Sequence, residues 1–153
     1  MDIKNKISCS CGKCGIELND TSPKYSVMCA CEDCRQALSW AEKNGGKKPK
    51  NILYSVYFRS DISNYFGLES MVVTHLREDA SSTRVYCKKC YSCIAVDHTN
   101  YHNNVFMIQP DYCKQNLNVQ IPPKTKAKGI TLRDLISKIG KIEVLDLIKG
   151  EVL

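Results

Sequence analysis

Nine of the ten cysteines in this 153-residue chain fall into three short triplets, and this clustering constrains the fold more than any other feature. Residues 9–14 and 29–34 share the pattern C-x-C-x-x-C, while residues 87–93 read C-x-x-C-x-x-C. Cysteines two or three residues apart bring their sulfurs together at little cost in loop entropy, so one metal ion can join segments that are distant in sequence. The clustering therefore predicts bound metal.

The rest of the composition favours a reduced, intracellular protein over a secreted one. Ten cysteines in 153 residues is below the content of about 8–10% that is typical of short disulfide scaffolds. Residues 1–6 are not followed by an apolar run, so we expect no secretory signal. The longest apolar-looking stretch is residues 52–58, far short of the roughly 20 residues of a membrane span. We expect a cytoplasmic protein, with a nuclear location as the second choice and no membrane partner.

The positive charge is a weaker feature than the cysteines. The formal net charge is +6 and the sequence pI is about 8.8. Lysines gather in residues 43–50 and 124–128, but both runs are interrupted by or follow glycine or proline, as in solvated loops. No nucleic-acid-binding fingerprint accompanies them. The sequence therefore argues against a nucleic acid as the partner.

Between the cysteine triplets the chain has the pattern of short β-strands. The segments are rich in Ile, Val, Tyr and Phe and are separated by turn residues. We expect strands near residues 16–19, 25–30, 51–59, 70–76, 83–86, 94–96 and 104–108. Residues 36–42 can form one or two helical turns. This predicts a mainly β zinc-binding domain over residues 1–110.

The C-terminal part has a different character. Residues 111–129 are predicted to be a loop or linker, because Pro122-Pro123 blocks both a helix and a central strand. Thr131 and Asp134 resemble a capping box at the start of a helix, and Gly140 is suited to end it. Residues 130–153 are thus predicted to be a short amphipathic helical appendage, with residues 143–147 as a strand in the alternative. It either packs on the domain, which we favour, or contacts a protein partner or a second copy.

Zinc chemistry separates two kinds of cysteine site. Four thiolates in tetrahedral geometry make a closed structural site, whereas three protein ligands leave a position for water or substrate. Cys87 and Cys90 can complete a closed site with either early triplet. Spacing alone leaves open which triplet is closed.

Three motifs in order carry a resemblance to a known family. They are C-x-C-G at residues 9–12, C-x-C-x-x-C-R at residues 29–35 and R-x-Y-C-x-x-C at residues 84–90. Together they resemble the glutathione-dependent formaldehyde-activating enzyme and centromere protein V family over about residues 7–108. Where that family has Gly-Ser after the last cysteine, this chain has Tyr91-Ser92.

The resemblance implies two zinc ions per chain and an activity. It assigns a closed structural zinc site to Cys9, Cys11, Cys87 and Cys90. It assigns an open zinc site, which carries the chemistry, to Cys29, Cys31 and Cys34. The implied fold is the β-tent, built of several small, strongly curved antiparallel sheets. The implied reaction is that of a carbon–sulfur lyase, which condenses glutathione with formaldehyde to S-hydroxymethylglutathione, or acts on another thiol and aldehyde.

Two further assignments stay open at this stage. Arg35, the last residue of the second motif, can offset the charge of the open site or bind a glutathione carboxylate; alternatively it pairs with Glu32 or Asp33. A non-catalytic zinc module that binds a protein or chromatin is the alternative function.

The remaining cysteines and the histidines are not expected to bind metal. Cys14 and Cys93 continue apolar alternation and are interpreted as small buried hydrophobes. Cys113, in a polar segment, is interpreted as an exposed thiol. The three histidines are scattered and lack the surroundings of ligands: His75, His98 and His102.

Overall fold

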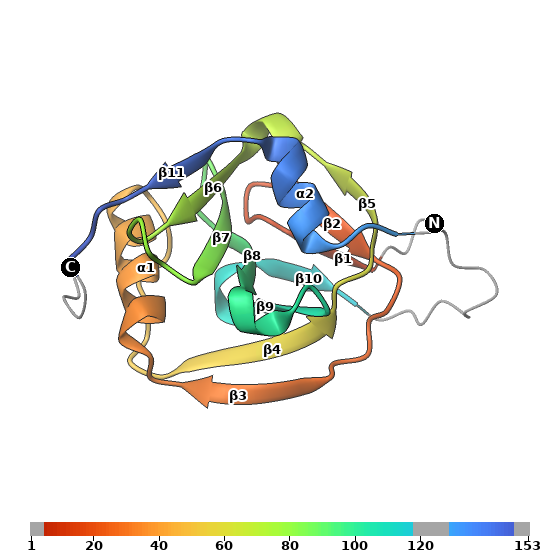
Figure 1. The fold of residues 1–153 in the computed structure, drawn as a ribbon, viewed down its shortest axis with the longest axis horizontal. Coiled ribbons are helices and arrows are strands. Elements are labelled where there is room, and N and C mark those ends of the chain that lie inside the picture. Colours follow the sequence, from red (N-terminus) through yellow and green to blue (C-terminus); the bar gives the residue numbers. More distant parts are fainter. Residues whose placement is uncertain (1–4, 118–128, 149–153) are drawn as a thin grey trace.

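A computed structural model describes residues 5–117 and 129–148 of the chain, which form two β-sheets and two α-helices (Figure 1). The smaller sheet contains, in spatial order, β10 (Lys114–Asn116), β1 (Lys6–Ser8), β2 (Gly15–Leu18) and β5 (Ile62–Phe66). The larger contains β11 (Ile142–Val144), β6 (Met71–His75), β7 (Ser82–Cys87), β8 (Cys93–His98), β9 (Val105–Ile108), β4 (Leu53–Arg59) and β3 (Tyr25–Cys29). The helices are α1 (Glu32–Lys43) and α2 (Leu132–Ile139). Three short 3-10 turns complete the set: η1 (Leu68–Ser70), η2 (Thr99–Tyr101) and η3 (Pro110–Tyr112).

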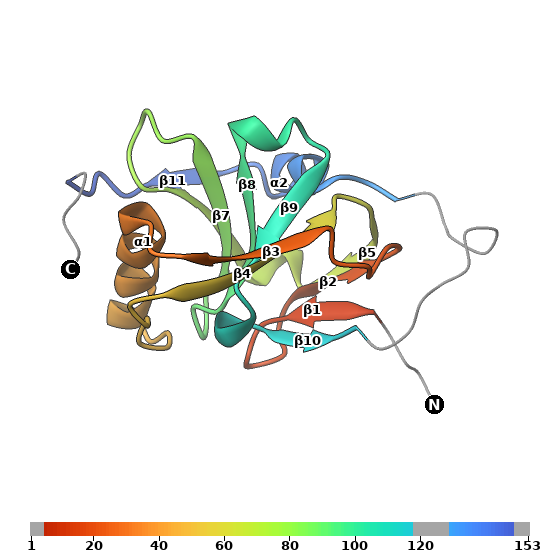
Figure 2. The same cartoon turned by 90° about the horizontal axis from the view of Figure 1, so that it is seen from below.

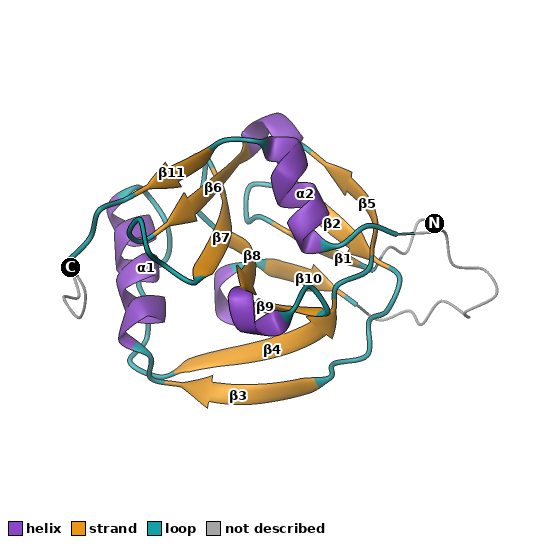
Figure 3. Cartoon of the chain, viewed as in Figure 1, coloured by secondary structure: helices purple, strands orange, loops and turns teal. Residues whose placement is uncertain are grey.

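The predicted mainly β architecture with antiparallel sheets and a C-terminal helix is confirmed (Figure 3). Each of the seven expected segments contains a strand. Only β11, which runs parallel to β6, departs from antiparallel pairing among the described strands. In Figure 2, β3 and β4 run across the direction of β7 and β8, so the larger sheet is strongly twisted.

Two apolar cores lie on opposite faces of the larger sheet, and β7 divides its side chains between them. Val85 belongs to the core shared with the smaller sheet, where Ile7 and Ile16 are fully buried. Its neighbour Tyr86 belongs to the second core, together with Leu38 of α1. Successive side chains of a strand point to opposite faces, which explains this division. The second core is the one that positions the N-terminus of α1.

Helix α1 is longer than the sequence predicted, because it begins at Glu32 rather than near residue 36. Its first turn carries Glu32 and Asp33, whose negative charges interact favourably with the helix N-terminus. Cys31 is the N-cap residue and Cys34 lies in the first turn. The second cysteine triplet therefore spans the junction between β3 and α1.

The C-terminal segment is built into the domain. Thr131 and Asp134 form the predicted capping box, with the Thr131 hydroxyl accepting from the Asp134 N–H at 3.2 Å. Leu135 of α2 is fully buried in the core between the sheets, and β11 extends the larger sheet beside β6. Neither of the two helices in the described part of the chain is long and apolar enough to cross a membrane.

The segment predicted to be a loop or linker, residues 111–129, contains a strand near its beginning. Residues 114–116 form β10, which pairs with β1 in the smaller sheet, instead of a loop. A strand of three polar residues without alternating hydrophobicity carries no pattern that sequence reasoning can use. Residues 118–128, including Pro122-Pro123, lie outside the described residues.

Leu135→Ala is expected to destabilise the whole domain by about 2–5 kcal/mol, because it removes a fully buried leucine and leaves a cavity. Urea unfolding monitored by circular dichroism measures the change. Lys138→Ala, an exposed position on the same helix, is the matched control and should change stability by less than about 0.5 kcal/mol. Equal effects of the two substitutions contradict the packing of α2 described above.

Candidate metal centres

Four of the predicted ligands meet where the two sheets approach each other. Cys9 and Cys11 lie in the turn after β1, Cys87 ends β7 and Cys90 lies in the turn that follows. Their four sulfurs lie within 4.8 Å of one another. The Sγ atoms of Cys9 and Cys11 are 3.5 Å apart, and those of Cys11 and Cys87 are 3.6 Å apart. Tetrahedral zinc with bonds of about 2.3 Å requires sulfurs about 3.8 Å apart, so this cluster fits the ion.

Backbone amides orient the sulfurs of this cluster. The Cys14 N–H donates to Cys9 Sγ at 3.3 Å, and the Lys89 N–H donates to Cys87 Sγ at 3.3 Å. Such bonds stabilise the thiolate and fix its direction, as outer partners of metal ligands do. Cys9 and Cys87 are fully buried, so the cluster has the character of a closed structural site.

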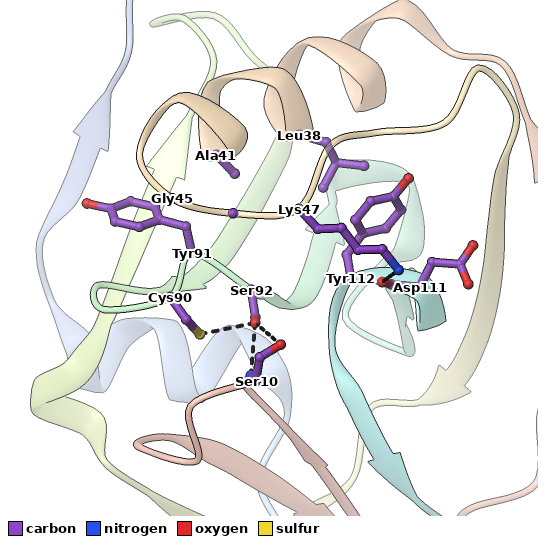
Figure 4. A pocket seen from close by; sticks show the side chains of 11 residues that line it. Ser10, Leu38, Ala41, Gly45, Lys47, Cys90, Tyr91, Ser92, Asp111 and Tyr112 are labelled. Atoms are coloured by element: carbon purple, nitrogen blue, oxygen red, sulfur yellow. Dashed lines mark hydrogen bonds between the residues drawn. The ribbon is translucent and has the colours of Figure 1, made fainter.

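Ser92 supports Cys90 in the same cluster (Figure 4). Its Oγ lies 3.1 Å from Cys90 Sγ and accepts from the Ser10 N–H at 2.9 Å. Tyr91 has φ 56°, a left-handed conformation that glycine adopts with less strain. Its ring packs edge-on against Trp40 of α1, with ring centroids 5.4 Å apart. This contact with α1 is one that a glycine at position 91 could not make.

A pocket of about 300 Å³ borders this site on the α1 side (Figure 4). Leu38 and Ala41 of α1 form one wall, and Tyr112 and Lys47 form another. Cys90 is the one ligand of the four that lines it. Because four cysteines already supply a tetrahedral set, this pocket offers no open metal position.

The second cluster joins β3 to α1. Cys29, Cys31 and Cys34 place three sulfurs within 4.8 Å of one another, and the Cys31 N–H donates to Cys29 Sγ at 3.3 Å. The position of Cys31 and Cys34 at a helix N-terminus favours thiolates. The Cys34 thiol lowers the pKa of Cys31 to about 5, while its hydrogen bond to Cys31 and its burial raise the pKa of Cys34. One thiol of the group thus ionises at the expense of another, and a divalent cation is what allows all three to be thiolates.

This cluster forms part of the wall of a pocket of about 340 Å³. Cys34 lies buried at the α1 side, Cys29 is half-buried and Cys31 is exposed. Tyr57 and Tyr101 line the same pocket, and their hydroxyl oxygens are 3.4 Å apart. Three protein ligands beside a cavity of this size are the arrangement of an open metal site. The structure therefore brings the seven cysteines together in the same two groups that the sequence resemblance names, and each group could hold a metal ion.

The arginine that meets the three-cysteine cluster is Arg84. Its side chain is only 3% exposed and its Nη2 donates to Cys34 Sγ at 3.5 Å. Burial opposes the charge of Arg84, but the neighbouring Cys34 sulfur raises its pKa. The sequence contains its signal, the arginine of R-x-Y-C-x-x-C, although strand pairing is needed to bring it to Cys34.

Arg35, the arginine named from the sequence, is half-buried on α1 and does not line the pocket. The alternative interpretation paired Arg35 with Glu32 or Asp33. In the structure, Asp33 forms its ion pair with Arg77, at 3.4 Å. Action of Arg35 on a substrate stays a prediction.

The other cysteines are placed largely as predicted. Cys14 and Cys93 are buried, and all ten cysteines are free thiols. The prediction for Cys113 was wrong: it is half-buried against the core, and its thiol donates to the Gln109 carbonyl at 3.7 Å. Of the histidines, His98 lines the three-cysteine pocket, but neither cluster of candidate ligands includes a histidine.

No protein-family model, curated protein or solved structure significantly matches this chain.

Proposed function

We propose that the protein is a zinc-dependent carbon–sulfur lyase that joins glutathione, or a related thiol, to formaldehyde or another aldehyde. The observation that carries the proposal is the contrast between the clusters. Four cysteines lie together and could supply a complete tetrahedral set, while three others form part of the wall of a pocket of about 340 Å³. A structural role alone does not require a three-ligand cluster beside such a cavity.

In this proposal the chain holds the metal and shields the reacting groups. Cys29, Cys31 and Cys34 would hold the zinc, which would lower the pKa of a bound thiol so that a thiolate is present at neutral pH. Tyr57 and Tyr101 contribute an aromatic wall that limits water around the sulfur. The thiol sulfur forms a bond to the aldehyde carbon, the C=O π bond opens, and the proton lost by the thiol ends on the oxygen. Nothing is oxidised or reduced.

The charge of the cluster favours this role over activation of the aldehyde. Zinc with three thiolates carries one net negative charge, which makes the ion a weak Lewis acid toward a carbonyl. Reduced thiols are required throughout, which suits the cytoplasm or the nucleus.

Glutathione and formaldehyde at neutral pH are expected to reach equilibrium with S-hydroxymethylglutathione faster in the presence of the zinc-loaded protein. Carbon-13 exchange spectroscopy with labelled formaldehyde measures both directions of the reaction. Cys29→Ser removes one ligand and should abolish the acceleration, whereas Cys113→Ser, which changes a thiol outside both clusters, should retain it. A rate equal to that of buffer for the wild-type protein would reject the proposal.

A second function is supported by a different observation. Strand β3 is an edge of the larger sheet and exposes apolar side chains: Tyr25 is 50%, Val27 40% and Met28 65% exposed. Exposed apolar edges mark interaction surfaces. If catalysis is absent, a zinc-stabilised binding module becomes the better interpretation.

A further inference from the structure

We propose that Arg84 sets the charge of the three-cysteine site and thereby makes it selective for a singly charged anionic ligand, such as a thiolate. The inference deepens the proposed function, on which it rests only for the identity of the physiological ligand. It concerns a residue buried behind the metal ligands rather than one of the ligands.

The placement of Arg84 supports a direct electrostatic role. It lies within β7, paired with Thr74 of β6 and Val96 of β8, and its side chain points toward α1. Arg84 as a whole is 3% exposed, and its Nη2 lies 3.5 Å from Cys34 Sγ. Nη1 has no hydrogen-bond partner in the part of the chain that the structure describes. A buried guanidinium is strongly unfavourable unless a negative charge lies beside it. The position of Arg84 therefore indicates that the cysteine cluster is anionic in the folded protein.

The charges around the pocket show what this guanidinium does. Three thiolates and one Zn²⁺ leave one negative charge, which Arg84 neutralises. Asp33, in the same wall, is paired with Arg77 at 3.4 Å and so adds little net charge. His98 is the remaining ionisable group of the wall apart from tyrosines and cysteines. With Arg84 present, an arriving thiolate meets a neutral centre, and without it the thiolate meets a centre that already carries a negative charge.

Ligand selectivity in the cobalt-substituted protein tests the inference, because the visible bands of Co²⁺ report ligands that enter its coordination sphere. The probes are thiocyanate, an anion, and imidazole, a neutral ligand. A unit charge about 6 Å away changes the ratio of their affinities by roughly tenfold to a hundredfold. Arg84→Met should therefore lower the affinity for thiocyanate by about this factor relative to the affinity for imidazole. Arg84→Lys, which keeps the charge, should keep most of the wild-type ratio of the two affinities. Arg59→Met removes an equal charge from an exposed position on β4 and should leave the ratio unchanged.

Several outcomes overturn the inference. If Arg84→Met lowers the affinities for both ligands equally, Arg84 only supports the fold. If Arg59→Met changes the ratio of the affinities as much as Arg84→Met does, the net charge of the protein and not the position of Arg84 determines the selectivity. If Arg84→Met does not fold, Arg84→Gln makes the same comparison, because glutamine removes the charge but can still donate a hydrogen bond to the Cys34 sulfur.

The outcome is separable from that of the proposed function. Loss of thiocyanate selectivity in Arg84→Met, without any acceleration of S-hydroxymethylglutathione formation by the wild type, supports the inference and rejects the enzyme. Acceleration by the wild type together with unchanged selectivity in Arg84→Met supports the enzyme and rejects the inference about Arg84.

Discussion

Cys87→Ser is expected to leave the protein unfolded, or without a cooperative unfolding transition, at 25 °C. Cys87 is fully buried at the end of β7 and belongs to the cluster that joins this strand to the turn after β1. Structural zinc sites contribute about 10–16 kcal/mol in small zinc-binding peptides, which is comparable to the whole stability of an ordinary domain, about 5–15 kcal/mol. Loss of one thiolate also leaves the remaining sulfurs buried without their cation. Circular dichroism during urea titration, with metal content measured on the same sample, checks the result.

Cys113→Ser is the control for this substitution. It makes the same chemical change at a half-buried cysteine that belongs to neither cluster, and serine can still donate to the Gln109 carbonyl. We expect two zinc ions and a stability within about 1 kcal/mol of the wild type. A folded Cys87→Ser protein that retains two zinc ions is incompatible with a structural metal site at this position.

Cys31→Ser is expected to remove one zinc ion and the proposed activity while the fold remains. Cys31 is exposed and is the N-cap residue of α1, where its side chain makes no capping hydrogen bond. Serine is among the preferred N-cap residues, and a good cap is worth about 0.5–2 kcal/mol. The substitution thus deletes a metal ligand and at the same time offers α1 a better cap. With the four-cysteine site loaded and the three-cysteine site empty, Cys31→Ser should be at least as stable as the wild type in the same state.

Elemental analysis should give one zinc per chain for Cys31→Ser against two for the wild type. Cys29→Ser is its matched variant, since it removes a ligand of the same cluster from the end of β3, where no cap is gained. We expect both variants to lose the same metal and keep the four-cysteine site, and we expect Cys31→Ser, which gains a cap, to be the more stable of the two. Unfolding of Cys31→Ser as complete as that of Cys87→Ser would contradict the division of labour between the clusters.

Most strands could be predicted because their signals are local, whereas the pairing of the first cysteine motif with Cys87 and Cys90 came from the resemblance and not from spacing. Alternating or continuous apolar residues mark β4, β6 and β8, and the three motifs give the ligand sets. Strand β10 could not be predicted, because Lys114–Asn116 has no apolar face and exists only through its pairing with β1. Its partner lies more than a hundred residues earlier in the chain.

The two arginines show the same limit at the site. Arg35 is next to Cys34 in sequence, but a residue that follows another on a helix points about 100° away from it. Arg84 is fifty residues away and reaches the Cys34 sulfur because β7 faces α1. Adjacency in sequence therefore does not identify the arginine that contacts the Cys34 sulfur, although Arg84 stands in a recognised motif.

The different sequence spans of the two clusters have a consequence for synthesis on the ribosome. Cys29, Cys31 and Cys34 lie close together in sequence, within residues 29–34, whereas Cys11 and Cys87 of the four-cysteine cluster are 76 residues apart. At a translation rate of about 5–20 residues per second, Cys87 follows Cys34 by roughly 3–10 s. During that interval all three ligands of the second cluster have been synthesised. The four-cysteine cluster still has only Cys9 and Cys11, because Cys87 and Cys90 have not yet been added to the chain. Metal ions supplied by the cell thus meet the three-cysteine group first and the four-cysteine group, which joins β7 to the turn after β1, last.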